Sequence, residues 1–189
     1  MPPASGRRRR LRRRERGAVA VETALVSLVL ATILAGIIDT SMLFRDSLSV
    51  SSAARGGART ASSEPLASTF ARDAAQQAVN ALSDLQYTRI TKLWVYKANA
   101  STGDPVGGWG GCSSNCVAFT VSATGTVSAG TGTWSGRNAC AGSTLDAVGV
   151  YVQYNHPSTI GVFFNNQPIS EHAVMELQPI PSSATCVSS

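Results

Sequence analysis

Apolar positions along this chain first gather in one unbroken segment, residues 18–38, in which Glu22 is the only charged side chain. Folded as a helix, this segment is long enough to cross about 30 Å of hydrocarbon. A buried helix of a soluble core seldom runs this far without a polar stripe. The pattern therefore predicts a transmembrane helix over residues 18–38.

A helical pattern continues beyond the predicted span as far as Ser63. Small and apolar residues recur at alternating steps of four and three, on the face opposite to a polar one: Leu43, Ser47, Val50, Ala54, Gly57 and Ala61. Such a narrow stripe suits close packing against another helix or a globular head. The pair Gly56–Gly57 is expected to be a weak point and a bend. An ordinary exposed helix next to a membrane would show the same stripe, so the stripe alone does not establish assembly.

The rest of the chain predicts a second helix followed by a sheet. Pro65 and the alanine-rich run after it favour a helix over 66–85, which would complete a helical stalk of residues 39–85. Alternating patterns then predict four strands, over 87–98, 117–127, 146–156 and 170–179. The fold class is therefore predicted as α+β: a long N-terminal transmembrane and amphipathic helix, a second helix, and a small, mainly antiparallel β-sheet head formed by residues 86–189.

Glycine, serine and threonine are dense between residues 103 and 142, which predicts long exposed loops in the head. The segment Gly108–Trp109–Gly110 is not accompanied by the lysine of a P-loop or by a dinucleotide-binding pattern. We interpret its glycines as loop residues.

The net charge of +5 is a property of the N-terminus. Eight of the 16 lysines and arginines fall between Arg7 and Arg16, and removing residues 1–17 leaves 8 basic against 10 acidic residues. No basic patch with interleaved aromatics is present elsewhere, so nucleic-acid binding is not expected. A cationic flank before an apolar span places the N-terminus in the cytoplasm and the residues from Asp39 onward outside the membrane.

The junction between the arginines and the apolar segment resembles a known signal. The segment "RGAVAVETALV" is similar to the class III signal of type IV pilin-like proteins: a basic leader, glycine at −1 and glutamate at +5, here Gly17 and Glu22 with Ala18 as the first mature residue. The longer stretch that ends in "AARGGARTA" resembles the TadE-like family of minor pseudopilins of tight-adherence (Tad, or Flp) pili. Thr23 stands where an aromatic residue is usual in this family, and Asp39 stands where glutamate is common. The resemblance implies that residues 1–17 form a cytoplasmic leader that a prepilin peptidase removes.

Glu22 lies four residues after Ala18 and therefore on the same helix face. Its charge is favoured near the positive end of the helix, but an unpaired charge at membrane depth costs at least about 2.5 kcal/mol. The resemblance implies that the free α-amine of a neighbouring subunit neutralises Glu22 during assembly. In the alternative interpretation, Glu22 reaches the headgroups without a protein partner.

The function implied by the resemblance is pilus assembly or adhesion by a membrane-anchored protein that acts through protein–protein contacts. Its expected partners are the prepilin peptidase, other pilins or pseudopilins, the Tad secretion machinery and the lipid bilayer. The alternative is a signal-anchored exported binding domain that is not part of a filament.

All cysteines follow the predicted span, so they would face an oxidising exterior, and two disulfides are expected among Cys112, Cys116, Cys140 and Cys186. Four cysteines allow three connectivities, and the sequence does not choose among them. A zinc site is disfavoured by the compartment and by the spacing. His156 and His172 lie in no recognised catalytic motif. We therefore expect neither catalysis nor a cofactor.

Overall fold

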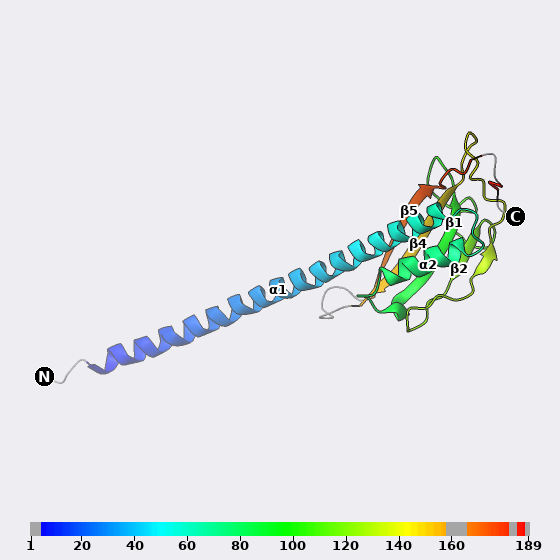
Figure 1. The fold of residues 1–189 in the computed structure, drawn as a ribbon. Helices are drawn as coiled ribbons and strands as arrows, with labels where there is room; N and C mark the ends of the chain where they lie inside the picture. Colours follow the sequence, from blue (N-terminus) through cyan, green and yellow to red (C-terminus); the bar gives the residue numbers. More distant parts are fainter. Residues whose placement is uncertain (1–4, 158–165, 182–184, 188–189) are drawn as a thin grey trace.

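The computed structural model describes residues 5–157, 166–181 and 185–187, with side chains from Gly17 onward (Figure 1). The first residues of the predicted leader, 1–4, and the side chains of its arginine run lie outside the described part. The helices are α1 (Ser5–Ser63) and α2 (Phe70–Asn80), with a short 3-10 helix η1 (Tyr87–Arg89). The strands are β1 (Ile90–Ala98), β2 (Cys116–Phe119), β3 (Thr131–Thr133), β4 (Ala147–His156) and β5 (Gln167–Glu176).

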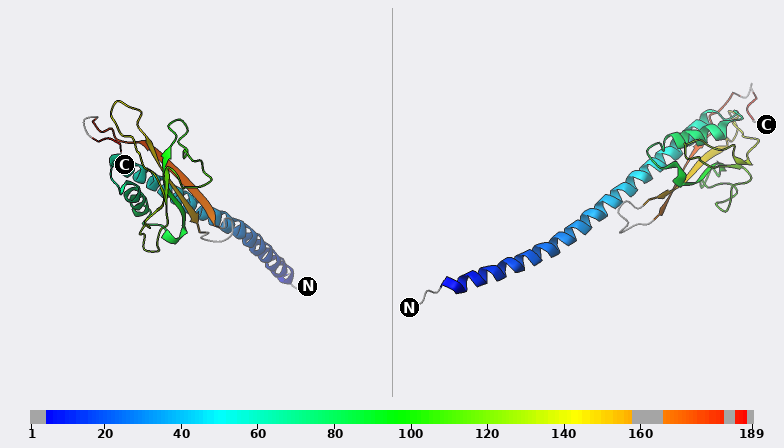
Figure 2. Two further views of the ribbon diagram at one scale, coloured as in Figure 1. Left: turned by 90° about the vertical axis from the view of Figure 1, so that its right-hand side faces the viewer. Right: turned by 90° about the horizontal axis from the view of Figure 1, so that it is seen from below.

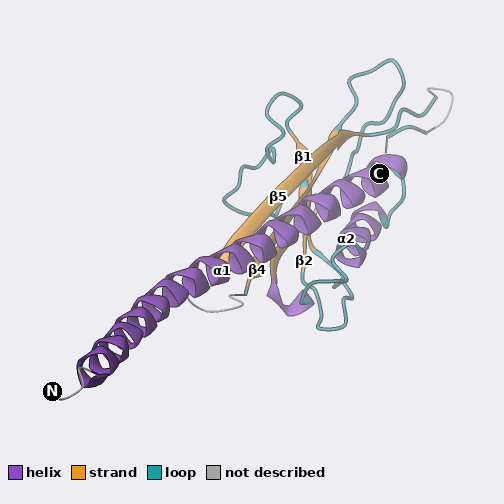
Figure 3. Ribbon diagram, turned by 90° about the vertical axis from the view of Figure 1, so that its left-hand side faces the viewer, coloured by secondary structure: helices purple, strands orange, loops and turns teal. Residues whose placement is uncertain are grey.

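The strands described form one sheet in the order β3-β2-β1-β4-β5, and every neighbouring pair is antiparallel. The α1 helix and the α2 helix cover one face of this sheet (Figure 3). The predicted α+β fold class, with a long N-terminal helix, a second helix and an antiparallel sheet, is confirmed.

The four predicted strands, over 87–98, 117–127, 146–156 and 170–179, correspond to β1, β2, β4 and β5, but their bounds differ from the observed ones, and β3 was not predicted. The strand predicted over 117–127 ends at Phe119, because the chain then turns back on itself in a hairpin closed by a bridge between Val121 and Val127. The short strand β3 pairs with β2 although its sequence is only Thr-Gly-Thr. A glycine between two threonines is typical of a loop. The segment is extended because it pairs with β2.

The second helix is shorter at both ends than the predicted range 66–85. Its start is displaced to Phe70 because Arg137 holds the preceding turn: its guanidinium donates hydrogen bonds to the carbonyl oxygens of Pro65 (2.8 Å) and Ala67 (3.2 Å). The same guanidinium carbon lies 3.8 Å from the centroid of the Phe70 ring. Burial lowers the pKa of Arg137 below its ordinary value.

The main core lies between the helices and the sheet. Residues of α1 such as Val50 and Ala54 pack there with α2 and with the inward-facing side chains Val95 of β1 and Val150 of β4. The α1 helix continues through Gly56–Gly57, where the sequence suggested a bend. A Cβ at Gly57 would lie only 2.9 Å from the carbonyl oxygen of Ala74 and 3.2 Å from Val150 Cγ1. Gly57 therefore allows three elements, α1, α2 and β4, to approach closely.

Only the C-terminal part of α1 takes part in this core. The N-terminal part extends away from the head as a single helix (Figure 2). The protein thus presents a long helical surface that its own head does not cover.

Candidate assembly interface along α1

The uncovered part of α1 is apolar. Its large hydrophobic side chains between Val19 and Ile38 are 46–64% exposed. Among the described residues, the structure contains one helix that is long and apolar enough to cross a membrane, and this is the helix. The surface fits the predicted span over residues 18–38, because a bilayer would bury side chains that the head leaves open.

The residues of the expected processing signal lie on this uncovered helix. Gly17 has no neighbouring atom within 4 Å of the place where a Cβ would be, and Ala18 and Glu22 are both exposed. The structure therefore brings these three residues together on one helical segment, away from the described residues of the head. Cleavage after Gly17 and pairing of Glu22 stay predictions.

A buried carboxylate–imidazole pair fixes α1 at the point where the helix enters the head. Asp46 Oδ2 of α1 lies 2.6 Å from His156 Nδ1 at the end of β4, and both side chains are buried. Burial, together with the charge of Asp46, raises the pKa of nearby Tyr154. Since breaking a buried pair leaves an uncompensated polar group, this contact favours one orientation of the helix relative to the sheet.

No local pattern in the sequence predicts this pair. His156 precedes a proline at a strand end and looks like a turn residue, and Asp46 follows Arg45 on a helix that is largely polar in this region. The two residues are separated by 110 positions in the chain, and only the tertiary fold brings them together.

A groove lies beside α1 just outside the head core. Phe44 and Leu48 of α1 are 66% and 70% exposed and line a groove of about 640 Å³ with small residues of the same helix and Ala81 after α2. At its margin, Arg45 and Asp84 form an exposed ion pair of 3.3 Å, which contributes little to stability. Phe44 and Leu48 are one helical turn apart, so they form a single apolar edge.

This edge was missed by the sequence interpretation, which assigned packing to the stripe of small residues. That stripe was placed correctly, because Val50, Ala54, Gly57 and Ala61 are all buried in the head. The signal for the second edge was present in the spacing of Phe44 and Leu48, two large apolar residues four positions apart on a face that is otherwise polar.

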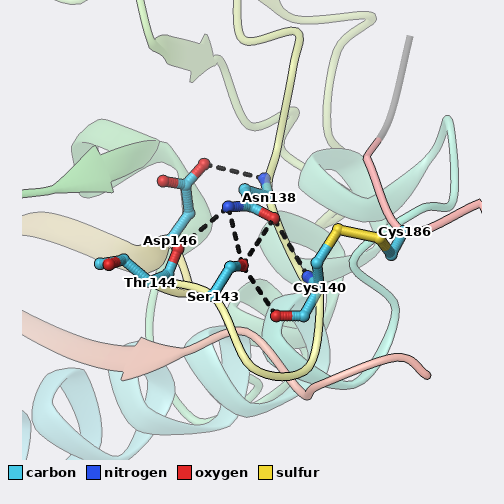
Figure 4. The surroundings of a disulfide bond; sticks show 6 residues. All are labelled: Asn138, Cys140, Ser143, Thr144, Asp146 and Cys186. Atoms are coloured by element: carbon cyan, nitrogen blue, oxygen red, sulfur yellow. Dashed lines mark hydrogen bonds between the residues drawn. A yellow bond between two sulfur atoms is a disulfide. The ribbon is translucent and has the colours of Figure 1, made fainter. Parts of the chain in front are cut away.

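The four cysteines form two disulfides, Cys112–Cys116 and Cys140–Cys186, with Cα–Cα distances of 5.1 Å and 4.9 Å. The second joins the C-terminal tail to the loop before β4 (Figure 4). Asn138 stabilises that loop: its side chain donates to the Thr144 carbonyl oxygen (3.0 Å) and accepts from the Cys140 N–H (3.1 Å). The second disulfide therefore holds two irregular segments of the head together.

The described residues contain no group of three or more histidine, cysteine, aspartate or glutamate side chains that could hold a metal ion. The two histidines lie apart in the fold: His156 is buried against α1, and His172 is exposed on the opposite face of the sheet. In the described hydrogen bonds, neither histidine has a serine, threonine or cysteine side chain as its partner.

The observations above define a class of protein: a small α+β head carried on a helix that can cross a membrane, with its apolar surface left open for other molecules. The family model for TadE-like protein matches residues 17–59, which confirms the resemblance in the sequence. The matched segment runs along α1 from the expected cleavage glycine to Arg59 and so includes all of the small-residue stripe except Ala61. The match covers 43 of the 189 residues, and it suggests a membrane-anchored protein associated with Tad pili. No curated protein and no solved structure matches the chain.

Proposed function

We propose that this chain is a minor pseudopilin of a Tad (Flp) pilus system and acts by assembling with other subunits. In this proposal a prepilin peptidase removes residues 1–17, residues 18–38 stay in the cytoplasmic membrane, and the stalk (39–85) and head (86–189) lie outside it. The arginine flank supports this orientation through the positive-inside rule. The match of residues 17–59 to the TadE-like model supports the kind of partner: other pilins or pseudopilins and the Tad secretion machinery.

The exposure of Leu48 is the observation that carries the assembly proposal. Leu48 lies ten residues after Ile38, which in a helix is about 15 Å and therefore beyond the headgroups of the membrane. A membrane anchor needs no apolar side chain there, yet Leu48 is 70% exposed beside a groove. An apolar helix of a neighbouring subunit would bury Leu48 and Phe44 together, in continuity with the contacts of the span. The alternative, an exported binding domain on a signal anchor, gives this surface no role.

The proposal is tested by the change Leu48→Ser, with Val106→Ser as the matched control. Val106 is a large apolar residue that is 53% exposed on the loop between β1 and β2, away from α1. We expect Leu48→Ser to lower co-purification with the pilus machinery several-fold, normalised to processed protein in the membrane, and Val106→Ser to leave it unchanged. Equal recovery of both variants and the parent would favour the exported binding domain instead.

A further inference from the structure

A second feature lies on the face of the sheet that α1 and α2 leave uncovered. There a cavity of about 390 Å³ is lined by residues of three strands and one loop: Lys92, Trp94, Asp104, Trp109, Tyr151, Ser170 and His172. Trp94 of β1 and Tyr151 of β4 are cross-strand partners and place their ring centroids 5.5 Å apart. The Trp109 ring, from the loop between β1 and β2, lies 5.0 Å from Tyr151 and 5.5 Å from His172. The cavity is therefore bounded by three large aromatic rings and a set of polar side chains.

The Trp109 ring, which forms one side of the cavity, is held in place although the side chain is 40% exposed. Its indole Nε1 donates a hydrogen bond to Asp104 Oδ1 (3.1 Å), and Tyr96 Oη donates to the carbonyl oxygen of Gly103 (3.0 Å) in the same loop. The Cys112–Cys116 disulfide joins the end of the loop to β2. These contacts orient the ring before any ligand arrives, which lowers the entropy lost on binding.

The sheet beneath is also shaped for this arrangement. The Tyr96 ring lies across Gly149 of β4, where an added Cβ would be 2.6 Å from Tyr96 Oη. Because a glycine stands at this position, Tyr96 lies flat on the sheet and packs edge-on against Trp109, with ring centroids 5.8 Å apart. The aromatic rings on this face therefore form one packed cluster, which consists of Trp94, Tyr96, Trp109 and Tyr151.

We propose that this cavity binds a pyranose ring of a carbohydrate. A pyranose has an apolar face of C–H groups, which packs on the electron-rich face of an aromatic ring, and a rim of hydroxyls that both donate and accept hydrogen bonds. The lining supplies both kinds of partner: Trp109 and Tyr151 offer ring surface, the Lys92 ammonium donates, the Asp104 carboxylate accepts, and Ser170 does both. A cavity of this volume lies in the range of small-molecule sites.

Two other ligand classes fit the geometry less well. A cationic ligand would meet the Lys92 ammonium, whose Nζ already lies 5.3 Å from the centroid of the Trp94 ring. A planar base binds most tightly between two parallel rings, and the interplanar angles of Trp109 with Tyr151 and with His172, 55° and 62°, leave it only one ring to stack on. A sugar, whose faces and rim differ in polarity, meets neither difficulty.

The site does not depend on the proposed assembly role. The cavity and the α1 surface lie on opposite faces of the sheet, because Trp94 and Tyr151 alternate with Val95 and Val150, which face the helices. A subunit packed along α1 would therefore keep the cavity open.

The test is saturation-transfer NMR on the full chain in a detergent without a sugar headgroup, with glucose, galactose, mannose and N-acetylglucosamine as probes. We expect transfer to the ring C–H protons of at least one sugar. The change Trp109→Ala should weaken that binding about tenfold or more, because it removes the exposed ring wall. Val106→Ala, an exposed apolar residue of the same loop, is the matched control and should bind as the parent does.

A second variant guards against misfolding of the loop. Ser170 is exposed on β5, so Ser170→Phe is compatible with the strand and would fill the cavity. This variant should also abolish transfer while the thermal unfolding midpoint stays close to that of the parent. Absence of transfer from all four sugars, or equal transfer in the parent and in both cavity variants, would overturn the proposal.

Discussion

Single positions on the inner face of α1 determine how closely the helix approaches the sheet. Gly56 and Gly57 are consecutive residues of one helix, yet a Cβ at Gly56 would meet no atom within 4 Å, whereas a Cβ at Gly57 would contact Ala74, Ala78 and Val150. The backbone oxygen of Ala74 cannot swing aside as the end of a flexible side chain can. The same chemical change at the two positions should therefore have opposite effects.

We expect Gly57→Ala to destabilise the head by about 1–3 kcal/mol through overpacking. In contrast, Gly56→Ala should leave the free energy of unfolding unchanged or raise it by up to about 1 kcal/mol, since alanine has the higher helix propensity. Denaturant unfolding of the full chain in detergent measures both values. Equal free energies for the two variants would mean that α1 does not pack on α2 and β4 as described.

Tyr96 makes the stability of the head sensitive to alkaline pH. Burial, and secondarily the charge of Asp104, raise its pKa above the ordinary 10.0. Above pH 10.0 an unfolded chain therefore releases a proton that the folded protein retains, so stability is complete below this pH and falls as the pH rises beyond it. Tyr96→Phe should flatten this decline in a pH series of denaturant midpoints. An unchanged slope would show that Tyr96 does not cause it.

At the scale of elements, the two disulfides differ in the length of chain that they close. Cys112–Cys116 spans a sequence separation of 4, whereas Cys140–Cys186 spans 46 and ties the tail to the loop before β4. The longer loop loses more conformational freedom when it is closed, so the tail disulfide should be the more stabilising of the two.

By the chain-entropy relation, replacing Cys140 and Cys186 by serine should lower the free energy of unfolding by about 4 kcal/mol, and replacing Cys112 and Cys116 by about 2 kcal/mol. Thermal unfolding of the two double variants under non-reducing conditions compares them directly. The Cys112/Cys116 variant should in addition weaken sugar binding at Trp109, because it releases the end of that loop. A larger loss of stability for this variant than for the Cys140/Cys186 variant would contradict the ranking.

The elements that the sequence predicts well are those whose signal is local and periodic. The α1 stripe and the alternation in β4 repeat over many residues, so many positions indicate the same type of secondary structure. In contrast, the start of α2 depends on Arg137, which reaches the turn at Pro65 from a distant loop, and β3 depends on pairing with β2. Trp109 between glycines has no local pattern that points to a cavity, and Asp46 meets His156 only in the folded chain. These features are long-range contacts, which propensity and period do not encode.

For the whole molecule, the central question is whether the uncovered helix serves as an anchor or as an assembly surface. Substitution of Glu22 distinguishes the two roles experimentally. For an anchor, Glu22→Ala removes a charge from the membrane and should be neutral or improve insertion. For an assembling subunit, the carboxylate meets the α-amine of a partner, and its removal should reduce incorporation without affecting cleavage.

We expect both Glu22→Ala and Glu22→Gln to lower co-purification with the pilus machinery, normalised to processed protein, because glutamine retains the shape of glutamate but not its charge. N-terminal sequencing of the membrane-extracted parent and variants should give Ala18 as the first residue. If both variants assemble as the parent does, Glu22 has no part in assembly. If only the intact leader is recovered, the cleavage signal has been misread.

The continuity of α1 has a mechanical consequence. One helix runs from the apolar segment into the core of the head, and the Asp46–His156 pair and the close contact at Gly57 clamp it there. Because the helix is uninterrupted between the two parts, a pulling force on the head is transmitted along the helix axis to the apolar segment. A rotation of that segment likewise turns the head as a rigid lever. A force applied at the outer face of the sheet would therefore be transmitted through α1 to whatever holds the N-terminal end of the helix.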